Sequence, residues 1–157
     1  DSPNQSINYV ECHDNYTFRD FVTSIAPNMS EEVMKDYAKL ALSMVLVSQG
    51  VPFIHSGQEF FRTKHGVENS YKSPDEINMI NWSLADENWD MVEMVKDLIS
   101  IRKEYNITDI SFRTWIEPLE IYNIENDVVL LYKRSYIKFF ELVVCNTHNE
   151  CVELFCG

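Results

Sequence analysis

The fold of this chain is decided by the stretch NYVECHDN at positions 8–15. Residues 7–13 are rich in β-forming side chains without a clean alternation of apolar and polar types, which is typical of a parallel strand covered on both faces. A second short apolar run lies at 51–55, and a helical pattern follows each run. The order strand, helix, strand, helix predicts a parallel α/β arrangement with right-handed crossovers.

Two amphipathic helices are expected between and after these strands. Ser30 is a favourable N-cap for the first helix, and two glutamates follow it, where the helix dipole stabilises anions. We expect Gly50 to end this helix and Pro52 to prevent its continuation. We expect Asp86 or a neighbouring residue to cap the second helix. The predicted apolar stripes are Val33, Tyr37, Leu40, Ala41, Met44 and Val45 on the first helix, and Met91, Val92, Val95, Leu98, Ile99 and Ile101 on the second.

The sequence pattern changes after about residue 110, where short β-forming runs alternate with polar breaks. This pattern is typical of antiparallel strands, so a separate β-domain is expected, with its boundary between Tyr105 and Phe112. Two strands and two helices are too few for a complete open α/β domain, so the chain is predicted to be a segment of a larger protein. The strands predicted for the β-domain are Leu119–Ile124, Val128–Lys133, Lys138–Cys145 and Cys151–Phe155.

The composition is that of a globular protein: 45% of the 157 residues are hydrophobic and 13% are aromatic. A net charge of -12 does not favour nucleic acid, since such binding depends on Lys and Arg neutralising phosphates, but it is compatible with a neutral ligand such as a sugar. No apolar run is long enough to indicate a membrane partner. The four cysteines show no CxxC spacing, so free thiols are expected, and disulfides among the last three stay open. The chain begins at Asp1 without a methionine, so the compartment stays open.

The pair His13–Asp14 is the most informative candidate site. It follows a predicted parallel strand, and a carboxylate beside an imidazole at a strand end can hold two adjacent sugar hydroxyls. A strand terminus that only caps the next turn would have the same spacing, and both interpretations stay open. A metal-dependent phosphohydrolase would need further ligands, and His55, His65 and His148 show no ligand spacing, so neither a metal site nor a cofactor is expected.

The second apolar run is part of a longer motif, QGVPFIHSGQEF at 49–60, and two further motifs follow it, RTK at 62–64 and NSY at 69–71. Together with the stretch at 8–15, they closely resemble the alpha-amylase superfamily of glycoside hydrolases, and within it the type I pullulanases. The resemblance implies an α/β fold plus a β-domain. Residues 1–107 would be the last two βα units of a (β/α)8 TIM barrel, and residues 108–157 would be part of an antiparallel β-sandwich domain.

The resemblance also implies a chemistry. The family cleaves α-glucosidic bonds with retention, using an Asp nucleophile and a Glu acid/base on earlier barrel strands that this chain does not contain. Asp14 corresponds to a third carboxylate, which grips the sugar and stabilises the transition state. The implied ligand is an α-glucan polysaccharide or oligosaccharide, such as pullulan, amylopectin or glycogen. The implied substrate-binding residues are His13, Asn15, Arg62, Asn69, Tyr71 and Asp75.

The other carboxylates are not expected to complete a hydrolase. Glu11 is predicted on the opposite side of its strand from Asp14, and Glu59 is predicted to hold its loop or support a neighbour. The chain alone is therefore expected to be inactive, with the upstream barrel segment of the same parent protein as its partner. The alternatives are a non-catalytic carbohydrate-binding or interaction module, and a related transferase or branching enzyme. The loop at 62–75 is equally compatible with a surface loop pinned by its own side chains.

Overall fold

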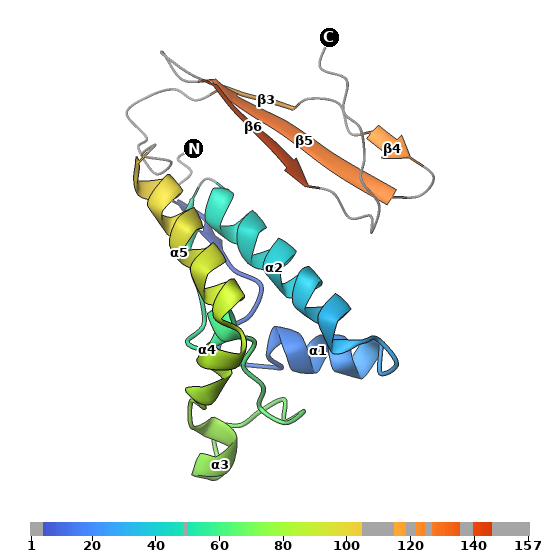
Figure 1. Ribbon diagram of the computed structural model, residues 1–157, viewed down its shortest axis with the longest axis vertical. Coiled ribbons are helices and arrows are strands. Elements are labelled where there is room, and N and C mark those ends of the chain that lie inside the picture. The colour runs from blue at the N-terminus through green and yellow to red at the C-terminus, as the bar shows by residue number, and fades with distance from the viewer. Residues whose placement is uncertain are drawn as a thin grey trace. The chain divides into compact units, whose positions relative to one another are not determined.

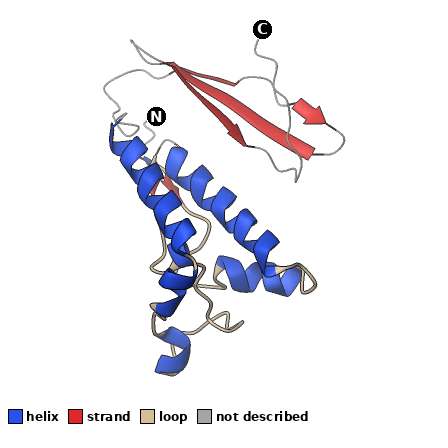
Figure 2. Ribbon diagram, viewed as in Figure 1, coloured by secondary structure: helices blue, strands red, loops and turns tan. Residues whose placement is uncertain are grey.

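The computed structural model describes residues 5–48 and 50–104 in full, and beyond them only the backbone of four strands between positions 115 and 145. The chain divides into two compact units, Asp1–Thr108 and Asp109–Gly157. The predicted boundary region lies outside the described residues. Figures 1 and 2 show the elements of each unit. The first unit contains β1 (Ile7–Asn8), α1 (Phe18–Ile25), α2 (Glu31–Val47), β2 (Val51–Pro52), η2 (Gln58–Phe60), α3 (Asp75–Asn78), α4 (Ser83–Glu87) and α5 (Trp89–Glu104).

The two predicted strands pair in parallel, as expected, but they are much shorter than the sequence suggested. Ile7 lies opposite Val51 and Asn8 opposite Pro52. The backbone N–H of Val51 donates to the Ser6 carbonyl, and that of Phe53 donates to the Asn8 carbonyl, both at 2.9 Å. The expected extents of 7–13 and 51–55 are wrong, because the β1 chain bends at Val10 and leaves the ladder.

Gly50 has a different role from the predicted one. Helix α2 ends at Val47, and the C-cap is Ser48. Gly50 instead has φ +101°, and a Cβ there would lie 2.4 Å from Ser6 Oγ. A glycine is needed at this position because β2 begins in close contact with the chain that leads into β1.

Helix α2 begins as predicted, but its buried face is rotated from the expected stripe. The Ser30 side chain accepts a hydrogen bond from the backbone N–H of Val33. Tyr37 and Met44, predicted to face the core, are 41% and 40% exposed. The buried residues are Ala38, Leu42, Val45 and Leu46. The stripe prediction was wrong at these two positions because both sides of the helix carry apolar residues, and packing against α5 selects one of them.

The core of the first unit lies between α2 and α5, which run side by side (Figure 1). Ile101 was predicted to face the core, yet it is 40% exposed, and Arg102 is buried in its place. The Arg102 guanidinium donates to the carbonyls of Leu46, Ser48 and Gly50 at 2.6, 2.7 and 2.6 Å. A charged group thus caps the end of α2 and fixes the approach to β2. The core cluster is Ala38, Leu42, Leu46, Phe61, Met91 and Val95.

Helix α1 was not among the two helices predicted from the sequence. Thr17 is its N-cap: the Thr17 hydroxyl donates to the Asp20 carboxylate at 2.8 Å and accepts from the Asp20 backbone N–H at 3.2 Å. This reciprocal pair is a variant of the capping box, and its spacing was readable in the sequence.

The predicted cap of the second helix was also misplaced. Asp86 lies inside α4, and the Asn88 carbonyl accepts from Met91 N–H in the first turn of α5.

The second unit contains an antiparallel sheet of four strands, in agreement with the predicted strand direction. β5 pairs with each of the other three. The first strand was not predicted, and the run predicted at 151–155 lies outside the described residues. The strands are β3 (Trp115–Pro118), β4 (Tyr122–Ile124), β5 (Asp127–Ser135) and β6 (Phe140–Cys145). In the part of the chain that the structure describes, no helix is both long enough and apolar enough to cross a membrane.

Candidate functional site

A pocket of about 180 Å³ opens beyond the C-terminal ends of β1 and β2. Its lining comes from the two segments that leave these strands. Parallel sheets place ligand sites at this end because the loops that follow neighbouring strands converge there. The lining residues are His13, Asp14, His55, Arg62, Lys64, Asn69, Ser70, Tyr71 and Asn78.

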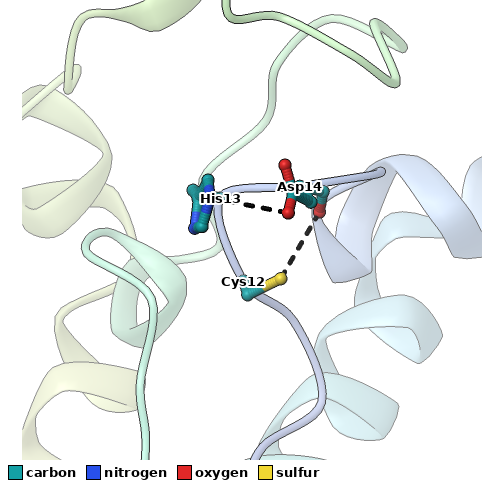
Figure 3. A group of neighbouring side chains, drawn as sticks. All are labelled: Cys12, His13 and Asp14. Atoms are coloured by element: carbon teal, nitrogen blue, oxygen red, sulfur yellow. Dashed lines mark hydrogen bonds and ion pairs between the residues drawn. The ribbon is translucent and has the colours of Figure 1, made fainter.

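The rim on the β1 side is formed by His13 and Asp14 (Figure 3). Their side chains are 81% and 70% exposed, and His13 Nε2 lies 3.5 Å from Asp14 Oδ2. The pairing is loose and solvated, so it contributes little to stability. The Asp14 carboxylate is therefore accessible to an incoming hydroxyl group.

Lys64, which is 1% exposed, supports the bend that carries His13 and Asp14. Its ammonium donates to the carbonyls of His13, Asn15 and Glu68. A buried charge is tolerated only when such bonds replace its water. Asn15 has φ +61°, so the chain turns sharply at this point. Lys64 thus fixes the backbone on both sides of Asp14.

Asp20 attaches the RTK motif to α1. Its buried carboxylate accepts hydrogen bonds from the Thr63 hydroxyl and from the backbone N–H of Lys64, in addition to Thr17. Because a carboxylate that accepts several bonds has little freedom to rotate, the 62–64 segment is anchored firmly to the start of α1.

A second buried carboxylate supports the floor of the pocket. Glu11 is 6% exposed and accepts from the Phe18 backbone N–H and from His55 Nδ1, the latter at 3.0 Å. The prediction that Glu11 lies on the strand is wrong, since β1 ends at Asn8. Because a carboxylate can only accept, His55 Nδ1 carries the proton of this bond, and His55 Nε2 lies 3.5 Å from an Arg62 nitrogen.

Arg62 lines the pocket, as expected of a substrate-binding residue, but both of its terminal nitrogens are bound to the protein. It is 8% exposed and donates to the carbonyls of Ser56 and Asn78 at 3.1 and 2.7 Å. A Cβ at Gly57 would lie 2.7 Å from Arg62 Cδ, so the turn closes around the Arg side chain. Glu59 accepts from the Gly57 backbone N–H at 3.0 Å, which is the loop-holding contact expected of it.

The other predicted site residues divide into two groups. Asn69 and Tyr71 line the pocket, and Tyr71 is 81% exposed. Asn15 and Asp75 do not line it. Asn15 contributes its backbone carbonyl to Lys64, and Asp75 is exposed in the first turn of α3.

Four lining residues were not among the predicted site residues: His55, Lys64, Ser70 and Asn78. His55 could have been found by analogy, because it follows β2 as His13 follows β1. Lys64 stands in a motif that was recognised, but burial of its ammonium depends on carbonyls remote in sequence. The Asn78 side-chain amide donates to the Ser70 and Ser73 carbonyls, and thereby holds the loop at 70–73 against α3.

The chain is similar to known proteins in both sequence and structure, although no protein-family model matches it. A pullulanase of Bacillus subtilis strain 168 is 50% identical over 103 residues, which cover 66% of this chain and 14% of that protein. The crystal structure of pullulanase type I from the same strain, complexed with maltose, superposes with a TM-score of 0.76 at 37% identity. The chain belongs to the pullulanase family.

A second solved pullulanase, from Anoxybacillus sp. LM18-11 in complex with maltotriose, has a TM-score of 0.72 at 40% identity. The superposition covers 84% of this chain and 19% of that one. For the Bacillus subtilis structure the corresponding shares are 87% and 19%. The chain therefore matches less than a fifth of the length of each of these pullulanases.

Proposed function

We propose that this chain is the segment of an α-glucan debranching hydrolase that contributes Asp14 as the transition-state stabiliser. The observation that carries the proposal is an accessible carboxylate at the rim of a pocket, beyond the ends of two parallel strands, in a chain of the pullulanase family. The substrates would be α-1,6 branch points in pullulan, amylopectin or glycogen. Pullulanase structures solved with maltose and maltotriose support an α-glucan ligand.

The proposed role of Asp14 follows from the charge that develops on the sugar. As the ring flattens towards an oxocarbenium-like state, hydrogen bonds to its hydroxyls become stronger. Two charge-assisted bonds at about 1.5–3 kcal/mol each correspond to about two to four powers of ten in rate. His13 would contact the same sugar. Tyr71 would stack on an apolar sugar face, and Asn69 and Arg62 would bind hydroxyls further along the pocket.

The described residues contain no second carboxylate facing Asp14 across the pocket. Glu11 is buried and bonded to His55, and Glu59 is bonded to its own loop. We therefore propose that the nucleophile and the acid/base come from another part of the parent protein, and that the chain alone does not hydrolyse glucans.

Exposed apolar side chains around β1 and β2 support the proposal that residues 1–107 are the last two βα units of a (β/α)8 barrel. Ile7, Tyr9, Val51 and Phe53 are 63%, 56%, 44% and 40% exposed. A two-stranded parallel sheet with open edges and apolar surroundings is unusual in isolation, because parallel sheets are normally covered on both faces. Further barrel strands of the same parent protein would cover them. Residues 108–157 would then begin the β-sandwich domain.

The test replaces the matching segment of Bacillus subtilis pullulanase with this chain and measures reducing sugar released from pullulan. We expect the chimera to be active and the isolated chain to be inactive. Asp14→Asn in the chimera should lower kcat by about two to four powers of ten. Asp97→Asn, an exposed carboxylate on α5, is the matched control. A chimera in which Asp14→Asn keeps its full rate would overturn the role of Asp14, and turnover by the isolated chain would overturn its inactivity.

A carbohydrate-binding role without hydrolysis is the second candidate, and the exposure of Tyr71 at the pocket rim favours it. Affinity electrophoresis in soluble starch distinguishes the two. Retardation of the isolated chain that Tyr71→Ala abolishes would show that the pocket binds glucan without the rest of the barrel.

A further inference from the structure

Three consecutive side chains after β1 converge where an extended chain would point them to alternate sides. Cys12, His13 and Asp14 lie on the segment between β1 and α1, and Figure 3 shows them as neighbours, with contacts from Asp14 to each of the other two. The thiol sulfur, an imidazole nitrogen and a carboxylate oxygen all lie within 4.8 Å of one another. The convergence accompanies the bend in the backbone at residues 13–15.

This donor set has a definite chemical preference. Thiolate, imidazole and carboxylate are the ligands of Zn²⁺ and related borderline ions, whereas Ca²⁺ and Mg²⁺ prefer sites built from several oxygens. Donors around a tetrahedral zinc ion lie about 3.5 Å apart. His13 Nε2 and Asp14 Oδ2 are already 3.5 Å apart. The Cys12 thiol is half-buried and makes a 3.7 Å bond to the Asp14 carbonyl, a weak contact that the thiolate would give up.

The backbone beneath these donors is already ordered. Lys64 binds the carbonyls of His13 and Asn15, so the bend does not need to reorganise when an ion arrives. The Lys64 charge opposes a cation, but its ammonium is turned to the carbonyl side of the bend. The net charge of the chain, -12, favours the binding of a cation.

We propose that Cys12, His13 and Asp14 form a binding site for a thiophilic divalent cation of the Zn²⁺ class, with the fourth position open to solvent. Binding releases the Cys12 thiol proton to the solvent. Because His13 and Asp14 also line the pocket, an ion held there withdraws both from a sugar. This second part rests on the proposed function: the cation inhibits the debranching reaction, and glucan competes with it.

The binding test uses calorimetric titration of the chain with Zn²⁺, in a Cys145→Ser, Cys151→Ser, Cys156→Ser background that leaves Cys12 as the only thiol. Two buffers of different ionisation enthalpy report proton release. We expect one ion per chain and release of about one proton. Removal of a group that only hydrogen-bonds to a metal ligand lowers metal affinity about 10–100-fold. Cys12 is proposed as a direct ligand, so Cys12→Ser should lower the Zn²⁺ affinity by at least that factor. His65→Gln removes an exposed histidine elsewhere and should change nothing.

Equal affinity for Mg²⁺, or unchanged Zn²⁺ affinity in Cys12→Ser, would overturn the site. Circular dichroism checks that each variant folds, and the chimera with Bacillus subtilis pullulanase is titrated in the same way.

In that chimera, Zn²⁺ should inhibit pullulan hydrolysis competitively, and Cys12→Ser should relieve the inhibition without changing the uninhibited rate. Binding without competitive inhibition would overturn the second part alone. An inactive chimera that still binds Zn²⁺ through Cys12 would support the site while contradicting the proposed function.

Discussion

The two segments that leave β1 and β2 form the same pocket in opposite ways. The segment after β1 presents His13 and Asp14 to solvent, with side chains 81% and 70% exposed. The segment after β2 buries its charged residues, with Arg62 at 8% and Lys64 at 1%, and binds them to backbone carbonyls. The exposed pair His13 and Asp14 can bind a ligand, whereas the buried Lys64 holds the bend that carries them. Substitution of the exposed pair should therefore lower activity, and substitution of a buried charged residue should lower stability.

The largest loss of stability is expected from Lys64→Met. Methionine has a similar length, but it leaves the carbonyls of His13, Asn15 and Glu68 without their buried donor. The expected destabilisation is about 3 kcal/mol, measured by urea unfolding. Lys103→Met on the exposed side of α5 is the matched control and should change stability by less than about 0.5 kcal/mol. Equal effects at the two positions would show that the bend is not held by Lys64.

The contrast between buried and exposed carboxylates can be tested at Glu11 and Asp14. Glu11→Gln weakens the bonds to the Phe18 N–H and to His55, so we expect about 1–3 kcal/mol of destabilisation. Asp14→Asn should leave the free energy of unfolding within about 0.5 kcal/mol of the parent value. A large loss of stability in Asp14→Asn would show that Asp14 supports the fold, and the contrast between the buried and the exposed carboxylate would not hold.

Alanine substitutions at two glycines distinguish the cost of steric crowding from the cost of backbone strain. Gly50→Ala introduces a Cβ 2.4 Å from Ser6 Oγ at φ +101°, which should cost about 2–3 kcal/mol and disturb the pairing of β1 with β2. Gly66→Ala also has positive φ, at +77°, but nothing lies within 4 Å of the new Cβ. It should cost only about 1 kcal/mol. Equal thermal midpoints for the two variants would contradict the close approach at Gly50.

The smallest effect is expected at the surface ion pair between α2 and α5. Lys39 Nζ lies 2.6 Å from Asp90 Oδ2, and its hydrogen bond holds the Asp90 pKa below the ordinary value of 3.8. Since the pKa is lower in the folded chain, the pair contributes stability above pH 3.8, and the contribution disappears as pH falls below it. Asp90→Asn should therefore lower the thermal midpoint slightly at pH 7 and not at pH 2. Glu93→Gln on the same helix is the control. A difference that persists at acid pH would show that the effect is not electrostatic.

Much of the first unit could be read from local sequence. Ser30 marked the start of α2, and the apolar runs around 8 and 51 marked two strands that do pair in parallel. Other features depended on packing. Tyr37, Met44 and Ile101 are as hydrophobic as their neighbours, and only the position of α2 relative to α5 decides which side is buried. The lengths of the two strands were overestimated because β-propensity depends on one segment alone, whereas a strand ends where its hydrogen-bonding partner diverges.

The motifs at 8–15, 49–60 and 62–64 were enough to recognise the family, since they combine strand signals with polar residues at fixed spacing. Among the site residues predicted from the sequence, His13, Asp14, Arg62, Asn69 and Tyr71 line the pocket. Only the tertiary structure decided that Lys64 and Glu11 are buried supports, that Asn15 contributes its backbone, and that Cys12 converges with His13 and Asp14. The physical reason is that burial and hydrogen bonding are properties of pairs of groups, and the bonds of Glu11 to His55 and of Lys64 to His13 and Asn15 join residues more than 40 positions apart.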